Sequence, residues 1–220
     1  MLCAAHDSLR QEHRVVTVDR VEQVRRVVRL EYFTIGYNSL EGLIALVAGF
    51  MAGSVALVGF GFDSVIEVTS GAALVWRFGS DTHGEQREST TLRIVGVCFV
   101  ALAAYVGYDG LRSLLLRELP DRSMPGVILA AVSLVVMPLL ARAKRRVAGT
   151  IASTALTADA RQTEFCTYLS AILLGGLLLN ALFGLWWADP LAGLVMAPII
   201  AKEGFDALRG KTCCAKCPSS

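Results

Sequence analysis

Charge is scarce in this sequence, and histidine is scarcer still. Of the 220 residues, 18% are charged and three are histidines, whereas 54% are hydrophobic and the mean hydropathy is +0.54. Soluble domains typically carry about 25% charged residues and about 45–50% apolar ones. The composition therefore argues against an ordinary soluble domain and favours one polytopic membrane domain.

Several common sequence signals are also missing. The first 15 residues, MLCAAHDSLRQEHRV, contain no apolar run, so they do not form a signal peptide. No Gly-rich phosphate-binding motif with a lysine is present, and His6, His13 and His83 all lie outside the apolar runs. Six scattered cysteines without a secretory signal do not indicate a disulfide framework. We therefore expect neither an enzyme nor a nucleic-acid-binding protein, and we expect no cofactor.

The apolar runs predict an all-α polytopic membrane protein with six transmembrane helices. A crossing helix needs about 20 mostly apolar residues, and such helices are predicted near 30–52, 54–77, 90–116, 124–142, 148–183 and 187–208. We interpret GFMAGS (49–54) as a tight turn; without it, 43–62 is a single span and Asp63 opens a loop. The apolar VTSGAALVW after Glu67 favours the turn. Asp189-Pro190 is a helix-start signal that divides the long run 165–201.

The basic residues predict the orientation. The side opposite the termini has only Arg112, Arg117 and Arg122. The other side is richer in Lys and Arg, and its fourth connection carries Arg142, Lys144, Arg145 and Arg146. The positive-inside rule then places both termini in the cytoplasm, for a protein integral to the cell (inner) membrane. We divide the chain into an amphipathic N-terminal segment (1–29), a six-helix domain (30–208) and a cysteine-containing tail (209–220).

Two carboxylates lie within the second predicted helix. Asp63 and Glu67 are four residues apart, so they share a helix face about 6 Å apart. A charge at mid-bilayer costs at least about 2.5–3.5 kcal/mol, and two neighbouring acids repel each other. The pair therefore needs a cation, a basic partner or protons, and we interpret it as a functional site. The alternatives are structural pairing with Arg161 or a position among the lipid headgroups.

The fifth predicted helix carries further candidate ligands on one stripe. The segment TADARQTEFCTYLS contains Asp159, Gln162 and Cys166 at helical spacing. Carboxylate, amide oxygen and thiolate together favour zinc or a softer ion over magnesium or calcium. Taken alone, Cys166 is better explained as a small buried hydrophobic residue.

Three segments in order resemble the cation diffusion facilitator family of divalent-metal exporters, over about residues 30–208. They are FDSVIEVTSGAALVWRF, TADARQTEFCTYLS and WWADPLAGLVMAPIIAKEGFDAL, which are similar to the second, fifth and sixth helices of that family. The first is also similar to the transmembrane protein 163 type branch, whose members are vesicular zinc transporters. The resemblance implies a tetrahedral metal site made by Asp63, Glu67, Gln162 and Cys166. The family has His in place of Gln162 and Asp in place of Cys166, and because Gln is a poor zinc ligand, Asp159 and Glu164 are alternatives to it.

From these residues we expect proton-coupled efflux of a divalent cation from the cytoplasm. Zn²⁺ is the first candidate, followed by cadmium, cobalt and nickel. The partners are then the metal ion, protons, the lipid bilayer and, as the family suggests, a second copy in a homodimer.

The tail supports a competing interpretation. Cys213, Cys214 and Cys217 form a C-C-x-x-C cluster that suits metal capture. A reducible thiol cluster and palmitoylation are the alternatives for it. A non-transporting membrane protein that senses metal or binds partners through this tail is therefore the second functional class.

Overall fold

The computed structural model describes residues 2–78, 84–151 and 154–209. Within these ranges the chain contains six α-helices and no strand, which confirms the all-α prediction. The helices are α1 (Leu2–Ala52), α2 (Val55–Phe78), α3 (Gly84–Leu116), α4 (Met124–Ile151), α5 (Thr154–Phe183) and α6 (Ala188–Leu208).

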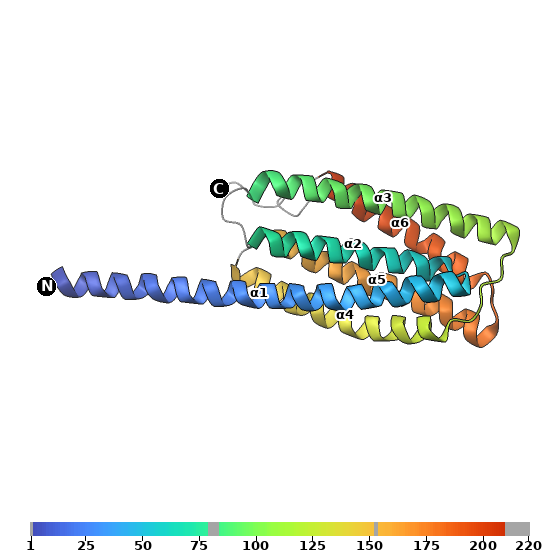
Figure 1. Cartoon of the computed structure of the whole chain (residues 1–220), viewed down its shortest axis with the longest axis horizontal. Helices are drawn as coiled ribbons and strands as arrows, with labels where there is room; N and C mark the ends of the chain where they lie inside the picture. Colours follow the sequence, from blue (N-terminus) through green and yellow to red (C-terminus); the bar gives the residue numbers. More distant parts are fainter. Residues whose placement is uncertain (1, 79–83, 152–153, 210–220) are drawn as a thin grey trace, which may run out of the picture.

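Five of these helices contain a segment long and apolar enough to cross a membrane. The segments are Val24–Ala52, Val55–Trp76, Arg93–Leu116, Met124–Thr150 and Asp159–Phe183. The remaining helix, α6, is only 21 residues long and contains four charged residues, Asp189, Lys202, Glu203 and Asp206. Its 21 residues nevertheless cover about 30 Å at about 1.5 Å per residue, which matches the hydrocarbon thickness of a bilayer. It packs along α3 within the same bundle (Figure 1).

The helices form an antiparallel bundle with α2 at its centre (Figure 1). α2 contacts α1, α3, α5 and α6, and it is the most buried of the five apolar segments. α1 also packs on α4, and α4 on α5. We call the end at which α1 enters the bundle and α6 finishes the N-terminal end. The first part of α1 projects beyond the bundle at this end (Figure 1).

A tight turn joins α1 to α2, as the sequence predicts, so 43–62 is not a single span. Gly53 in this turn has a φ of 64°, a left-handed conformation that favours glycine. The hydroxyl of Ser54 donates to Asp189 Oδ1 at 2.5 Å, and the backbone N–H of Val55 donates to Asp189 Oδ2 at 3.0 Å. Asp189, expected only to start the sixth helix, therefore also caps α2 and holds α6 against it.

Four helix boundaries differ from the sequence-based expectation. α1 runs unbroken through the proposed division at residue 29, because residues 2–35 contain no glycine or proline to interrupt it. α3 begins at Gly84 rather than at 90, α4 continues to Ile151 rather than ending at 142, and α5 begins at Thr154 rather than at 148. The basic residues assigned to the fourth connection therefore lie on a helix.

A common apolar core fixes the six helices around α2. It includes Phe60 of α2, Phe99 and Val106 of α3, Leu173 of α5 and Met196 of α6, with smaller side chains from α1 and α4. Large apolar side chains such as Phe33, Phe50 and Ile128 face outward instead. An apolar exterior around a helical bundle is the arrangement expected of a protein surrounded by lipid.

Candidate metal site

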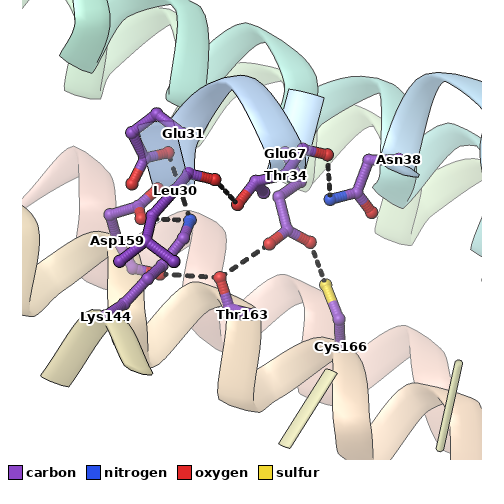
Figure 2. Close-up of polar contacts among 9 residues, drawn as sticks. All are labelled: Leu30, Glu31, Thr34, Asn38, Glu67, Lys144, Asp159, Thr163 and Cys166. Atoms are coloured by element: carbon purple, nitrogen blue, oxygen red, sulfur yellow. Dashed lines mark hydrogen bonds and ion pairs between the residues drawn. The ribbon is translucent and has the colours of Figure 1, made fainter. Parts of the chain in front are cut away.

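Asp63 and Glu67 of α2 meet Cys166 of α5 inside the bundle. All three side chains are buried, and Cys166 Sγ lies 2.9 Å from Asp63 Oδ2 and 2.8 Å from Glu67 Oε2. Figure 2 shows the second of these contacts. The i, i+4 spacing predicted from the sequence turns both carboxylates toward α5. The structure thus brings together three of the five proposed ligands, and we call this group the acid–thiol cluster.

The short contacts in the acid–thiol cluster require protons. A thiolate between two carboxylates at these distances would gather three negative charges in a buried, apolar setting, which is very unfavourable. A thiol has one hydrogen and donates it to one acceptor at a time. The other sulfur–oxygen contact then needs a protonated carboxyl group that donates to the sulfur. One proton for each of the two contacts removes the charge repulsion that would otherwise oppose the closed geometry.

Hydroxyl groups and further acceptors surround the cluster. Thr163 donates to Glu67 Oε1 at 2.7 Å, and Ser64 donates to the buried Glu41 of α1 at 3.1 Å. Two buried oxygens, Asp63 Oδ1 and Asn38 Oδ1, have no hydrogen-bond partner among the described residues. Such oxygens are available to a cation or to water.

The donor types fit a divalent cation, but the closed spacing is too tight for one. Zinc binds thiolate at about 2.3 Å and carboxylate oxygen at about 2.0–2.2 Å, so a tetrahedral site separates sulfur from oxygen by about 3.5 Å. The two observed separations are 2.9 and 2.8 Å. Consistent with this, no three His, Cys, Asp or Glu side chains of the described part of the chain stand in the arrangement of a formed metal site. Metal binding at the acid–thiol cluster therefore requires its ligands to move apart.

The other ligands proposed from the sequence are not part of the acid–thiol cluster. Gln162 is half-buried, and its Nε2 has no hydrogen-bond partner among the described residues. Asp159 and Glu164, the alternatives to Gln162, each have a basic partner, Lys144 and Arg145 respectively. Arg161 is exposed, so it does not neutralise the two acids of α2.

A buried ion-pair cluster that the sequence does not predict lies next to this group. The sequence predicts Lys144 in a loop, yet its side chain is fully buried between α1 and α5. Its Nζ lies 3.2 Å from Glu31 Oε2 and 2.5 Å from Asp159 Oδ2 (Figure 2). The spacing of Lys144 in the sequence is the signal that could have predicted its burial. Lys144 lies at helical spacing on the same face of α4 as the buried Ser133 and Met137. We call Glu31, Lys144 and Asp159 the lysine cluster.

Two of the sequence-based proposals cannot be placed. The tail cysteines, Cys213, Cys214 and Cys217, lie outside the described residues, and so do the side chains of the amphipathic segment before Glu22.

Comparison with known proteins identifies the family. The cation efflux transmembrane domain matches residues 33–211 of this chain, a stretch that includes all of α2 to α6. The chain belongs to the cation efflux family. It is therefore an integral membrane transporter, as the resemblance of its second, fifth and sixth helices implies.

Two relatives have similar lengths of match. The chain is 28% identical to an uncharacterized transporter of Methanocaldococcus jannaschii, over 83% of this chain and 68% of the relative. It is 23% identical to Transmembrane protein 163 of Xenopus laevis, over 84% of this chain and 66% of the relative. The chain thus spans about two thirds of the length of each relative. The second match confirms the similarity to the transmembrane protein 163 type branch.

Proposed function

We propose that this transporter exchanges a divalent metal ion for protons at Asp63, Glu67 and Cys166. The observation that carries the proposal is the pair of sulfur–oxygen contacts at 2.9 and 2.8 Å, which need protons in the closed cluster. Thiolate and carboxylate ligands bind metal only after losing those protons. Metal and protons therefore compete for the same three side chains, and this competition is sufficient to couple their movements.

The transport cycle follows from this competition. A metal ion that reaches the acid–thiol cluster displaces its protons and spreads the ligands toward tetrahedral spacing. After the site has become accessible from the other side, protons displace the metal and the cluster closes again. The buried hydroxyl of Thr163 stays on Glu67 through hydrogen bonding and orients that carboxylate. Asp159 is held by Lys144 and takes no part as a ligand in this scheme.

The donor set favours zinc among the metal substrates. One thiolate with two carboxylates suits zinc, and the sulfur also accepts cadmium, cobalt and nickel, whereas magnesium and calcium prefer oxygen alone. Gln162 is the candidate for the fourth position, either directly or through a water molecule.

The direction proposed is out of the cytoplasm. Arg25, Arg26, Arg145 and Arg146 lie toward the N-terminal end of the bundle. Of the basic residues that the structure describes, only Arg112, Arg117 and Arg122 lie toward the other end. By the positive-inside rule the N-terminal end faces the cytoplasm. We place the protein in the cell membrane and keep the homodimer as an expectation from the family.

The test is metal flux into proteoliposomes under an imposed pH gradient. Zinc, cadmium, cobalt and nickel are compared for the wild type, for Asp63→Asn and for Asp109→Asn. Asp109 is a matched control, because it is an acid on α3 that lies 3.8 Å from Arg112 rather than in the acid–thiol cluster. We expect flux that follows the pH gradient, is lost in Asp63→Asn and persists in Asp109→Asn.

Flux independent of the pH gradient would refute proton coupling, and normal flux in Asp63→Asn would refute the site. A chain truncated before Lys211 should transport normally. The competing sensing or interaction role is correct under two conditions. Neither the wild type nor any variant transports any of the four ions, and the truncation abolishes metal sensing or partner binding.

A further inference from the structure

The lysine cluster lies between the N-terminal end of the bundle and the acid–thiol cluster. Among the side chains that the structure describes, Val27, Leu74, Ala148 and Leu156 form a small buried apolar cluster toward this end. One helical turn further in, Glu31, Lys144 and Asp159 follow on the same three helices, α1, α4 and α5. On α5, Asp159 precedes Cys166 by seven residues, about 10 Å along the helix axis. An ion arriving from this end meets the lysine cluster first.

The geometry of the lysine cluster is that of a filled cation site. Lys144 Nζ lies within 3.2 Å of one carboxylate oxygen of Glu31 and within 2.5 Å of one of Asp159. The other oxygens, Glu31 Oε1 and Asp159 Oδ1, are buried and have no hydrogen-bond partner among the described residues. Two buried carboxylates therefore share one positive charge, and each keeps an oxygen for a second cation contact.

A hydrogen-bonded side chain connects the two clusters. The hydroxyl of Thr163 donates to Glu67 and also lies 3.2 Å from the main-chain oxygen of Asp159 (Figure 2). Gly71 of α2 completes the wall, because a Cβ at this position would stand 3.2 Å from Glu31 Oε2. The space around Glu31 is thus closed by close packing as well as by charge.

We propose that Glu31 and Asp159 form a second, transient site for the divalent cation and that Lys144 fills it whenever no metal passes. The ammonium group holds α1, α4 and α5 together and closes the N-terminal route to the acid–thiol cluster. An incoming ion displaces the ammonium, passes between the two carboxylates and moves on, and the ammonium returns. The identity of the ion rests on the proposed function, whereas the closure by Lys144 does not.

Thiol labelling of Cys166 tests the closure without any metal. In full-length protein in nanodiscs, the other five cysteines are replaced by serine, and labelling by a small cationic methanethiosulfonate is timed. Lys144→Met should accelerate labelling about tenfold or more, since a change of only about 1.4 kcal/mol in the balance of open and closed forms has that effect. Lys144→Arg keeps a cation between the carboxylates and should label at the wild-type rate.

Equal rates in Lys144→Met and the wild type would overturn the closure. If Lys144→Met does not fold, the triple variant Glu31→Gln/Lys144→Met/Asp159→Asn, which leaves no unpaired buried charge, takes its place. It should also label faster than the wild type, and a wild-type rate would again overturn the proposal.

Cobalt binding tests the second site itself. The acid–thiol cluster is disabled by Asp63→Asn/Glu67→Gln/Cys166→Ser, the tail cysteines are replaced by serine, and bound Co²⁺ is measured by equilibrium dialysis. Adding Lys144→Met should create binding of about one Co²⁺ per chain, because the two freed carboxylates are oxygen ligands. Adding Asp159→Asn as well should abolish it.

Absence of Co²⁺ binding in the folded Lys144→Met protein would overturn the second site. If that protein folds only with Co²⁺ present, the rescue counts as binding, and failure of Co²⁺ to rescue it counts against the site. Neither experiment requires flux, so the proposed function can fail in proteoliposomes while this inference stands, and the reverse also holds.

Discussion

The acid–thiol cluster and the lysine cluster lie about two helical turns apart and differ in one respect. Both contain two buried carboxylates. In the lysine cluster a fixed ammonium group supplies the compensating charge, whereas the acid–thiol cluster has only the neutral thiol of Cys166 and the hydroxyl of Thr163. Buried carboxylates without a basic partner require an exchangeable cation. The contrast shows that buried carboxylates are compensated in two ways, by the ammonium group of Lys144 in one cluster and by protons in the other.

The largest expected effect separates the roles of the two clusters. Glu67→Gln should reduce metal flux at least about 100-fold, because loss of a ligand costs more than the 10–100-fold typical of changes around a metal site. Its stability should stay near that of the wild type, since the amide still accepts from Thr163. Asp159→Asn should keep more flux than Glu67→Gln, because Asp159 is not a ligand in the acid–thiol cluster, and it should be less stable, because the shorter of the two ion pairs of Lys144 is lost. Flux in proteoliposomes measures transport by each variant, and thermal unfolding in detergent measures its stability.

If Glu67→Gln unfolded as readily as Asp159→Asn while keeping its flux, the two clusters would not differ in role.

A second effect concerns stability alone. Lys144→Met should lower the free energy of unfolding by about 3–5 kcal/mol, because it leaves two buried carboxylates without a counter-charge. Lys144→Met/Asp159→Asn should recover part of that loss, because one of the two uncompensated carboxylates is removed while that of Glu31 remains. Denaturant unfolding at fixed detergent concentration gives both values. A double variant no more stable than Lys144→Met would show that the two side chains are not energetically coupled.

A smaller effect concerns metal preference. Cys166→Asp replaces a soft ligand by a hard one, so the ratio of cadmium to zinc transport should fall about tenfold. Competition between the two ions in the same proteoliposomes measures the ratio directly, and Cys98→Ser serves as a control because that thiol is exposed on α3. An unchanged ratio would mean that Cys166 only fills space.

The smallest effect is expected at the surface. Arg145 follows Lys144 directly in the sequence and forms an ion pair with Glu164. The side chains of Arg145 and Glu164 are both substantially exposed. Arg145→Gln should therefore change the free energy of unfolding by less than about 1 kcal/mol, as is typical of exposed ion pairs. A loss as large as that of Lys144→Met would mean that burial does not distinguish these two basic residues.

Three of the five proposed ligands meet in the acid–thiol cluster, because its members follow helical spacing in apolar surroundings. Asp63 and Glu67 share a face by periodicity alone, and Cys166 is identified by its place in a segment resembling the fifth helix of the family. Six helices and the turn at Gly53 follow from apolar length and turn chemistry.

The lysine cluster was missed for a physical reason. Hydropathy treats Lys144 as a loop residue because its neighbours Arg142, Arg145 and Arg146 are basic as well. Its burial depends on the depth at which α4 meets Glu31 of α1, a residue 113 positions away in the chain. Sequence periodicity shows which residues lie on the same face of a helix, but it does not show the axial position of one helix relative to another. The bond of Asp189 to the start of α2 went unnoticed for the same reason.

The most direct test of the account is to count the protons released when zinc binds. Calorimetry of the purified protein, with the tail cysteines replaced by serine, is run in buffers that differ in ionisation enthalpy. We expect release of about two protons per Zn²⁺, one for each sulfur–oxygen contact of Cys166, and clearly fewer in Asp63→Asn. Zinc binding to the wild type without proton release would contradict the claim that metal and protons exchange at this cluster.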